Sequence, residues 1–160
     1  MAPTPPSDPA EPGLTLQMRR LPGNDLPLPG YASAGAAGMD LRACLPGGAV
    51  QIAPGAVRLI PTGFAVALPE GTEMQIRPRS GLSTRSLLLV PNSPGTVDAD
   101  YRGEVQVALW NAGPAPVCID HGDRIAQAVI ADVRRPTIEE AATLPDTPRG
   151  TGGFGSTGRR

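Results

Sequence analysis

Glycine and proline set the first limit on what this chain can fold into. Its 160 residues include 20 Gly and 20 Pro. Proline removes a backbone donor and clashes with the preceding turn inside a helix, and glycine costs conformational entropy there. The sequence therefore argues against long helices and predicts many turns joined by short strands.

Short apolar segments are separated by turn signals such as Pro54-Gly55 and Pro69-Glu70-Gly71. Alternation of apolar and polar residues is typical of half-buried strands, and it occurs in residues 14–18, 64–68, 74–76 and 105–109. Longer apolar runs predict strands covered on both faces, at 87–90 and 125–133. The spacing favours an all-β subunit, a distorted jelly roll or β-barrel. Two short helical segments are expected, at 82–86 and 137–143.

Composition divides the chain into three parts. Residues 1–13 are proline-rich and lack both a basic start and an apolar run. They are expected to be a disordered leader rather than a secretory signal. Residues 14–144 form the predicted β-rich domain, and residues 145–160 are expected to be a mobile, glycine-rich arm.

Charge and cysteine content argue against several function classes. With 14 Lys and Arg against 15 Asp and Glu, the chain lacks the basic excess that drives nonspecific binding to nucleic acid or membranes. A polyanionic ligand would need locally clustered arginines. No apolar run approaches the roughly 18 residues of a membrane span. Cys44 and Cys118 have no metal-ligand neighbours, so we interpret them as free thiols in a reducing, cytoplasmic compartment.

Five polar segments that contain glycine are spaced through the predicted strands, at 37–41, 78–83, 95–103, 122–127 and 149–158. The segment 95–103 combines two carboxylates, a phenol and a guanidinium between two glycines. In an extended strand, Asp98, Asp100 and Arg102 would share one side. The alternative interpretation is a hairpin corner with a solvated salt bridge.

Two of these segments carry groups that suit phosphate. Pro78-Arg79-Ser80-Gly81 offers a guanidinium, a hydroxyl and a backbone amide, although a turn with an exposed arginine has the same pattern. Segment 149–158 offers glycine amides and hydroxyls, but it lacks the lysine of a Walker A loop. Phe154 in that segment suits stacking on a base, or alternatively anchoring on a neighbouring surface.

The chain has one histidine, His121, which lies in a predicted turn. Ser-His-Asp and Cys-His chemistry therefore lack support, and a carboxylate must act as general base if the protein is an enzyme. The candidates are Asp40, Asp98, Asp100 and Asp123. Asp123 stands in Gly-Asp-Arg, which is equally an ordinary turn sequence.

In order and spacing, the five segments resemble the five motifs of the trimeric deoxyuridine triphosphate nucleotidohydrolases, the dUTPases. The segments at 95–103 and 149–158 are nearly complete matches, and the resemblance runs from about Leu14 to Arg160. It implies jelly-roll-like subunits in a homotrimer whose active sites are shared between chains. It further implies hydrolysis of dUTP to dUMP and pyrophosphate with Mg²⁺, which keeps uracil out of DNA and supplies dUMP for thymidylate synthesis.

The resemblance also implies roles for individual residues. Asp98 would activate the water that attacks the α-phosphorus, and Tyr101 would pack under the deoxyribose. Mg²⁺ would be bound mainly through the substrate triphosphate, with Asp40 in its water shell. Other residues would contact the phosphates (Arg79, Ser80, Gly81, and Gln127 from another chain), the uracil (Asn92, Gly95, Thr96, Val97, Gln106) or, from an arm that closes over the site, the triphosphate and the base (Arg149, Phe154, Gly155, Ser156, Thr157).

One departure and two rival interpretations remain. Where many relatives carry a glycine before the hairpin, this chain has Ser86-Leu87-Leu88. The related dCTP deaminases share the fold and a Pro-Arg-Ser segment and use a glutamate after the third motif, which here would be Glu104. A noncatalytic trimeric binding protein that keeps the pocket is the other rival. The Asp-x-Asp-Tyr pattern and the complete glycine arm favour triphosphate cleavage.

Overall fold

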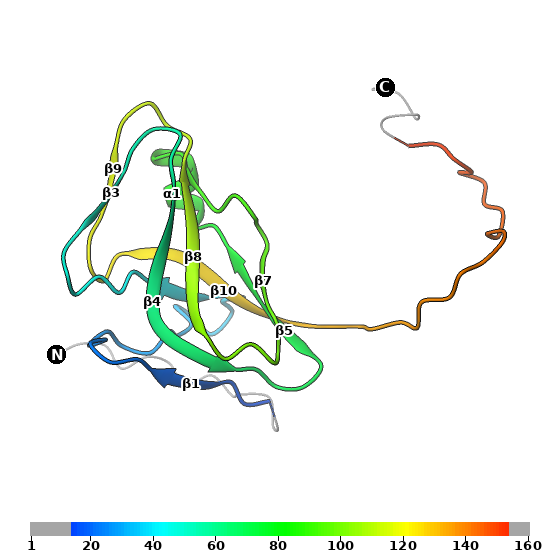
Figure 1. Ribbon diagram of the computed structural model, residues 1–160, viewed down its shortest axis with the longest axis horizontal. Coiled ribbons are helices and arrows are strands. Elements are labelled where there is room, and N and C mark those ends of the chain that lie inside the picture. The colour runs from blue at the N-terminus through cyan, green and yellow to red at the C-terminus, as the bar shows by residue number, and fades with distance from the viewer. Residues whose placement is uncertain (1–13, 154–160) are drawn as a thin grey trace.

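A computed structural model describes residues 14–153 of the chain. Those residues form antiparallel strands and one short helix, α1 (Ser80–Arg85), which confirms the all-β prediction (Figure 1). The strands in chain order are β1 (Gln17–Arg20), β2 (Met39–Arg42), β3 (Val50–Ile52), β4 (Val57–Ala67), β5 (Thr72–Arg77), β6 (Leu88–Leu89), β7 (Gly95–Val97), β8 (Glu104–Asn111), β9 (Val117–Ile119) and β10 (Arg124–Asp132).

The strands form two four-stranded sheets and one pair. Sheet A has the order β1-β4-β8-β6, and sheet B has the order β2-β10-β5-β7. The third sheet pairs β3 with β9. The apolar core includes fully buried side chains from all three sheets, among them Leu41, Ile52, Ile60, Met74, Leu88, Leu109 and Ile125. Burying each such side chain contributes about 1.5–3 kcal/mol relative to its exposure.

Strand β5 shows how the sequence separates the core from the outer surface of sheet B. Thr72, Met74 and Ile76 are buried, whereas the residues between them, together with Arg77, are partly or fully exposed. This period of two places alternate side chains on opposite faces. The outer face of sheet B is therefore polar along β5.

Several predicted elements differ from those observed. The strand expected at 14–18 begins at Gln17, and the run 87–90 contains only the two-residue β6. The prediction that 125–133 is covered on both faces is wrong, because β10 is buried at Ile125, Ala126 and Ala128 but only partly buried at Gln127 and at residues 129–131. The helix expected at 137–143 is absent. Ile138 is 94% exposed, and a helix this short does not form without packing.

The link between α1 and β6 contains an unusual backbone conformation. Leu87 has a φ of 49°, in the left-handed region that costs a side-chain-bearing residue about 1–2 kcal/mol. Its carbonyl accepts a hydrogen bond from the Ala112 N–H at 2.9 Å. Ser86-Leu87-Leu88 thus makes, with leucine, a turn for which glycine is the usual residue.

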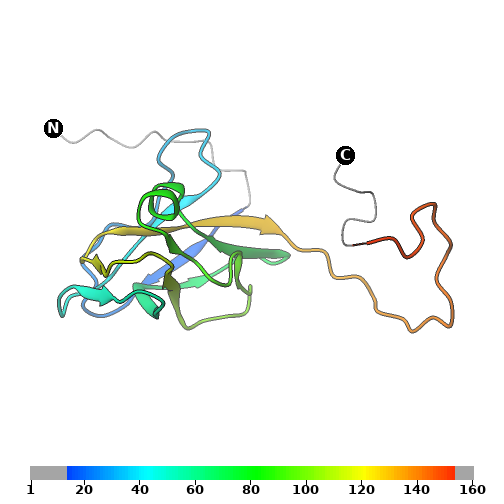
Figure 2. The same cartoon turned by 90° about the horizontal axis from the view of Figure 1, so that it is seen from above.

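Beyond β10, residues 133–153 lead away from the sheets (Figures 1 and 2). Along this segment Ile138 and Leu144 are 94% and 82% exposed. Residues 1–13 and the arm residues Phe154, Gly155, Ser156 and Thr157 lie outside the described part of the chain. The division into leader, domain and arm stays a prediction.

Within residues 14–153, no helix has the length and apolar character needed to cross a membrane.

Candidate active site

The outer face of sheet B brings together residues from three of the five polar segments. Asp40 on β2 lies directly opposite Gln127 on β10, which in turn lies opposite Arg77 on β5. Residues in such register point to the same side of a sheet. Asp40, Gln127 and Arg77 therefore form one row across three strands.

Asp40, on the edge strand β2, is the carboxylate that pairs with the arginines of this face. Its Oδ1 accepts a hydrogen bond from Arg79 Nε at 2.9 Å, and its Oδ2 accepts one from Arg124 Nη1 at 3.1 Å. The Asp40 side chain is 22% exposed, so water screens these ion pairs only in part. Arg79 Nη1 also donates to the Arg124 carbonyl at 3.3 Å. One carboxylate thus orients two guanidinium groups.

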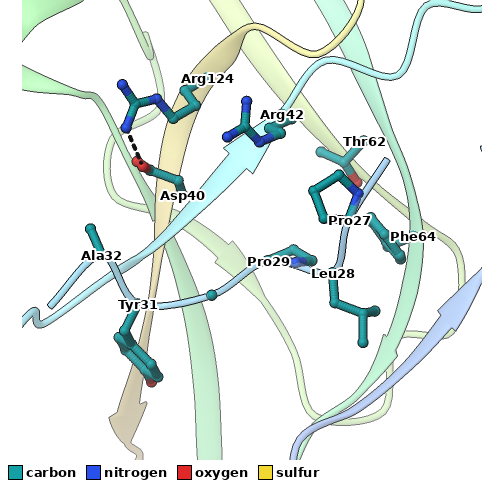
Figure 3. A pocket seen from close by; sticks show the side chains of 11 residues that line it. Pro27, Leu28, Pro29, Tyr31, Ala32, Asp40, Arg42, Thr62, Phe64 and Arg124 are labelled. Atoms are coloured by element: carbon teal, nitrogen blue, oxygen red, sulfur yellow. Dashed lines mark hydrogen bonds and ion pairs between the residues drawn. The ribbon is translucent and has the colours of Figure 1, made fainter. Parts of the chain in front are cut away.

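A cavity of about 240 Å³ lies beside this ion pair (Figure 3). Asp40, Arg42 and Arg124 form its charged wall, and residues 27–32, Thr62 and Phe64 complete the lining. Arg42 is held by a hydrogen bond of 2.7 Å from its Nη1 to the Gly122 carbonyl. Two arginines against one aspartate make this recess suitable for an anion.

The segment at 78–83 leads from β5 into α1. Gln127 Nε2 donates to the Pro78 carbonyl at 3.0 Å and so fixes the start of the segment. Ser80 and Gly81 are exposed in the first turn of α1. Gln127 was expected to reach this segment from another chain, but the structure places it there within the same chain.

Gly38, in the polar segment 37–41, lies close against Gln127 on β10. A Cβ at this position would lie 3.0 Å from Gln127 Oε1 and 3.3 Å from the Ala128 carbonyl oxygen. Such contacts are tight, so a side chain at Gly38 would displace Gln127. The segments 37–41, 78–83 and 122–127 thus converge on one face of sheet B.

The hairpin of the third polar segment lies at the far edge of the same sheet. Among residues 14–153, β7 pairs only with β5, with Gly95 opposite Ile76 and Val97 opposite Met74. Asn92 packs on Gly95, where a Cβ would lie 3.0 Å from Asn92 Nδ2. Thr96 is exposed.

The chain turns immediately after β7. The Tyr101 N–H donates to the Asp98 carbonyl at 3.1 Å, so the prediction of an extended strand with Asp98, Asp100 and Arg102 on one side is wrong. Within residues 14–153, Asp100 and Arg102 form no ion pair, because Arg102 Nη1 instead donates to the Ala99 carbonyl at 2.7 Å. A turn with carbonyl acceptors nearby satisfies this arginine locally.

Tyr101 lies at the surface rather than in the core. Tyr101 is 45% exposed, and its hydroxyl donates a hydrogen bond to the Glu104 carbonyl at 3.0 Å. The ring lies so close to Gly103 that a Cβ there would overlap it. Gly103 therefore permits the position of the Tyr101 ring.

Glu104 and Gln106 occupy sheet A. Glu104 Oε1 accepts a hydrogen bond from the Gly63 N–H at 2.8 Å, which holds the irregular part of β4. Gln106 is exposed on β8 opposite Pro61. The structure therefore does not bring Gln106 together with the β7 hairpin, which belongs to sheet B.

Asp98 and Arg79 lie at opposite corners of sheet B. The antiparallel register sets Val97 opposite Met74, so the next residue, Asp98, lies beside Glu73. Glu73 precedes Arg79 by six residues, along β5 and the two residues that follow it. At about 3.3 Å per residue this is roughly 20 Å. Arg79 also reaches across to Asp40 on β2, at the sheet edge opposite β7. A single chain thus keeps these two groups apart.

His121 lies in a turn, as predicted, and it is tied to the scaffold. Its Nδ1 accepts a hydrogen bond from the Leu45 N–H at 2.9 Å, and its Nε2 lies 2.8 Å from Asp25 Oδ1. Both described cysteines are free. Burial raises the pKa of the Cys44 thiol, and the carboxylates of Glu104 and Asp25 act in the same direction. None of these groups joins Arg79 or Asp98.

The described side chains do not form a metal-binding cluster on their own. Within residues 14–153, no group of three or more His, Cys, Asp or Glu side chains could hold a metal ion. Arginine nitrogens already contact both Asp40 carboxylate oxygens. A divalent cation at this face would therefore depend on oxygen ligands that a bound molecule supplies.

Comparison with known proteins places this geometry in a family context. The dUTPase family model matches residues 24–158. The chain is 53% identical over 148 residues to the deoxyuridine 5'-triphosphate nucleotidohydrolase of Caulobacter vibrioides, covering 91% of this chain and 96% of that protein. It is also 53% identical over 147 residues to the enzyme of that name from Methylocella silvestris, covering 91% and 92%.

Solved structures show the same similarity in three dimensions. A mutant dUTPase of Staphylococcus bacteriophage 80alpha with dUpNHpp has a TM-score of 0.81 and 25% identity, covering 90% of this chain and 98% of that one. A mutant dUTPase from phage phi11 of S. aureus, described with a structural Mg(II) ion, has a TM-score of 0.73 and 24% identity, covering 82% and 99%.

The Asp40 ion pairs lead to a stability prediction. Asp40→Asn should lower the free energy of unfolding by about 1–2 kcal/mol at low salt, because two partly exposed guanidiniums lose a common partner. Chemical denaturation measures the change, and the loss should shrink in high salt. Asp100→Asn, which removes an exposed carboxylate without an ion pair, is the control and should change stability by less than about 0.5 kcal/mol. Equal effects of the two substitutions would contradict the role of Asp40 as the common partner of Arg79 and Arg124.

Proposed function

The chain belongs to the dUTPase family and is a dUTP nucleotidohydrolase, and from this premise we propose that Asp98 activates the water that attacks the α-phosphorus. The products are dUMP and pyrophosphate. The observation that supports Asp98 is its place at an exposed turn directly after the β7 hairpin. No hydrogen bond occupies its carboxylate among the described residues. Both oxygens are thus available to hold and deprotonate a water, which must approach within about 3–3.5 Å of phosphorus.

Arg79, Ser80, Gly81 and Gln127 bind the phosphates in this proposal. Arg79 uses Nε and Nη1 for its contacts with Asp40 and Arg124. Its Nη2 edge therefore remains for a phosphate oxygen. Because Asp40 and Gln127 already hold this segment in place, little reorganisation is needed as negative charge develops on the phosphoryl group.

Mg²⁺ binds mainly through the substrate triphosphate. The described side chains form no ligand set of their own, which fits a cation that arrives with phosphate oxygens. When bound, Mg²⁺ offsets charge on the phosphoryl oxygens. For Asp40 to join the water shell of the metal, its carboxylate must share an oxygen that now contacts Arg79 or Arg124.

Active sites are shared between chains of a homotrimer. The separation of roughly 20 Å between Asp98 and Arg79, estimated from strand geometry, prevents one chain from placing both on the same phosphorus. A second copy supplies the missing half, with its Asp98 turn facing the Arg79 face of the first.

An exposed apolar surface on sheet A supports assembly. Val57, Leu59 and Trp110 are 47%, 64% and 37% exposed. Val57 lies opposite Trp110, and Trp110 lies opposite Leu89, so their side chains share one side of the sheet. Contiguous apolar surface of this kind on a soluble protein marks an interaction site. We assign it to contacts between copies of this chain.

The uracil is read along the β7 hairpin. In the described part of the chain β7 is an edge strand of sheet B, so its outer backbone groups can pair with a base. Gly95, Thr96 and Val97 supply these contacts with Asn92 behind them, and Tyr101 packs under the deoxyribose. A tight hairpin excludes the thymine methyl group sterically. Backbone amide groups that are complementary to uracil leave the cytosine amino group without a matching partner. Gln106 contributes to the uracil site only if another chain brings β8 to it.

The C-terminal arm closes over the bound triphosphate. Arg149 lies in the first half of this arm, where its Nε donates to the Gly152 carbonyl at 2.8 Å. Phe154, Gly155, Ser156 and Thr157 follow, and the proposal places Phe154 on the uracil ring. Closure of such a segment excludes water and completes the site.

The structure disfavours the deaminase alternative. Glu104, the glutamate that this alternative requires, uses Oε1 to accept the Gly63 N–H at 2.8 Å within sheet A. It therefore supports the fold of β4 rather than facing the β7 hairpin. As a dUTP hydrolase in the cytoplasm, the protein keeps uracil out of DNA and supplies dUMP for thymidylate synthesis.

Asp98→Asn should lower the turnover number for dUTP by about 10²- to 10⁴-fold, because the amide cannot accept the water proton. Binding of dUpNHpp should be retained, since the amide preserves the shape of the site. Pyrophosphate release from dUTP measures the first effect and calorimetry the second. Near-normal turnover would remove Asp98 from the mechanism, and release of ammonia from dCTP by the wild-type protein would favour deamination.

A chain that ends at Pro148 should keep its assembly but lose most dUTP hydrolysis. Residues 133–148 already lie outside the core, and the arm beyond them contributes no core side chain among the described residues. Light scattering measures the assembly, and pyrophosphate release measures activity. Dissociation of the truncated protein would show instead that the arm holds the subunits together.

A further inference from the structure

Arg77 is an exposed arginine that the proposed mechanism has not used. It is the last residue of β5, two positions before Arg79. We propose that the Arg77 guanidinium binds the outer phosphates of the nucleotide, those beyond the α-phosphate. This inference deepens the proposed function and rests on its assignment of the phosphates to Arg79 and Gln127.

The sheet register places Arg77 on the phosphate-binding face. It lies directly opposite Gln127, and Gln127 lies directly opposite Asp40. Gln127 donates to the Pro78 carbonyl and Asp40 accepts from Arg79 Nε. The other two residues of this row thus hold Pro78 and Arg79, the two residues that follow Arg77 in the chain.

A ladder of polar side chains along β5 orients Arg77. Its Nε and Nη2 donate to Gln75 Oε1 at 3.1 and 2.6 Å, and Gln75 Nε2 donates to Glu73 Oε1 at 2.7 Å. A two-nitrogen contact of this kind restricts the guanidinium plane. Nη1 is left for a further acceptor, and no carboxylate of residues 14–153 lies within ion-pair distance of Arg77.

The charge on this face favours a polyanion. Arg79 and Arg124 pair with the single carboxylate of Asp40, and Arg77 lies two strands from Asp40 on the same face. Glu73 is linked to Arg77 through Gln75. In a chain of net charge −1, this is a local cluster of arginines of the kind that a triphosphate requires.

The geometry of the shared site selects the outer phosphates. The nucleoside and the α-phosphate must lie at the Asp98 turn, which another chain supplies. The phosphates that extend onto the outer face of sheet B are therefore those farthest from the sugar. Arg77 meets them there, and it also contacts the pyrophosphate product before release.

Arg77→Gln tests the contact in the full-length protein with Mg²⁺ present. We expect binding of dUpNHpp to weaken about tenfold and binding of dUMP to stay within about twofold, because only the triphosphate reaches Arg77. KM for dUTP should rise about tenfold with kcat changed less than about threefold, as for a contact equally strong in ground and transition states. Arg77→Lys should recover part of the affinity.

Two matched variants decide between outcomes. Arg19→Gln makes the same charge change at an exposed position of β1 in sheet A, and Arg79→Ala tests the proposed phosphate site. The Arg77 contact is overturned if Arg77→Gln binds dUpNHpp as well as Arg19→Gln does. It is also overturned if Arg77→Gln loses affinity for dUMP and dUpNHpp equally. If Arg79→Ala weakens binding in that case, the proposed phosphate site stands without Arg77. If Arg79→Ala binds normally, the phosphate site itself is wrong and the Arg77 contact falls with it.

Discussion

The pairing of β5 with β10 on one side and with β7 on the other fixes where every charged group of the proposed site can lie. The β10 pairing sets Arg77 opposite Gln127, and the β7 pairing sets Val97 opposite Met74. A shift of one residue in either register would turn the polar face into the core. The buried residues of β5 prevent that shift, so hydrophobic packing on one side of the strand specifies chemistry on the other.

A few side chains position the arginines on the outer face of sheet B. The Asp40 carboxylate holds Arg79 and Arg124 through separate oxygens. Gln127 fixes the chain at Pro78, and Gln75 orients Arg77. Such contacts keep several cations on one surface, and a bound polyphosphate would relieve their mutual repulsion. Preorganised donors of this kind stabilise developing negative charge without the cost of reorientation.

The sequence predicted the features that depend on local pattern. Alternating residues identified β5 and β8, and the order of the five polar segments identified the family. It offered a hairpin corner at 95–103 as an alternative, but with a salt bridge. It did not predict that Arg102 donates to carbonyl groups instead of pairing with Asp100, because those carbonyl groups are visible only in three dimensions. The Asp40–Arg124 pair and the row through Arg77 were also missed, since strand register joins residues far apart in the chain.

The central claim is that one chain supplies the phosphate-binding face and another supplies Asp98. Mixed trimers of Asp98→Asn and Arg79→Ala chains, purified through a different tag on each, test it directly. Either variant alone should be nearly inactive. In every mixed trimer, however, one of the three interfaces joins an intact Asp98 to an intact Arg79, so about one-third of wild-type dUTP turnover should return. Mixed trimers no more active than the two parent variants would contradict a site shared between chains.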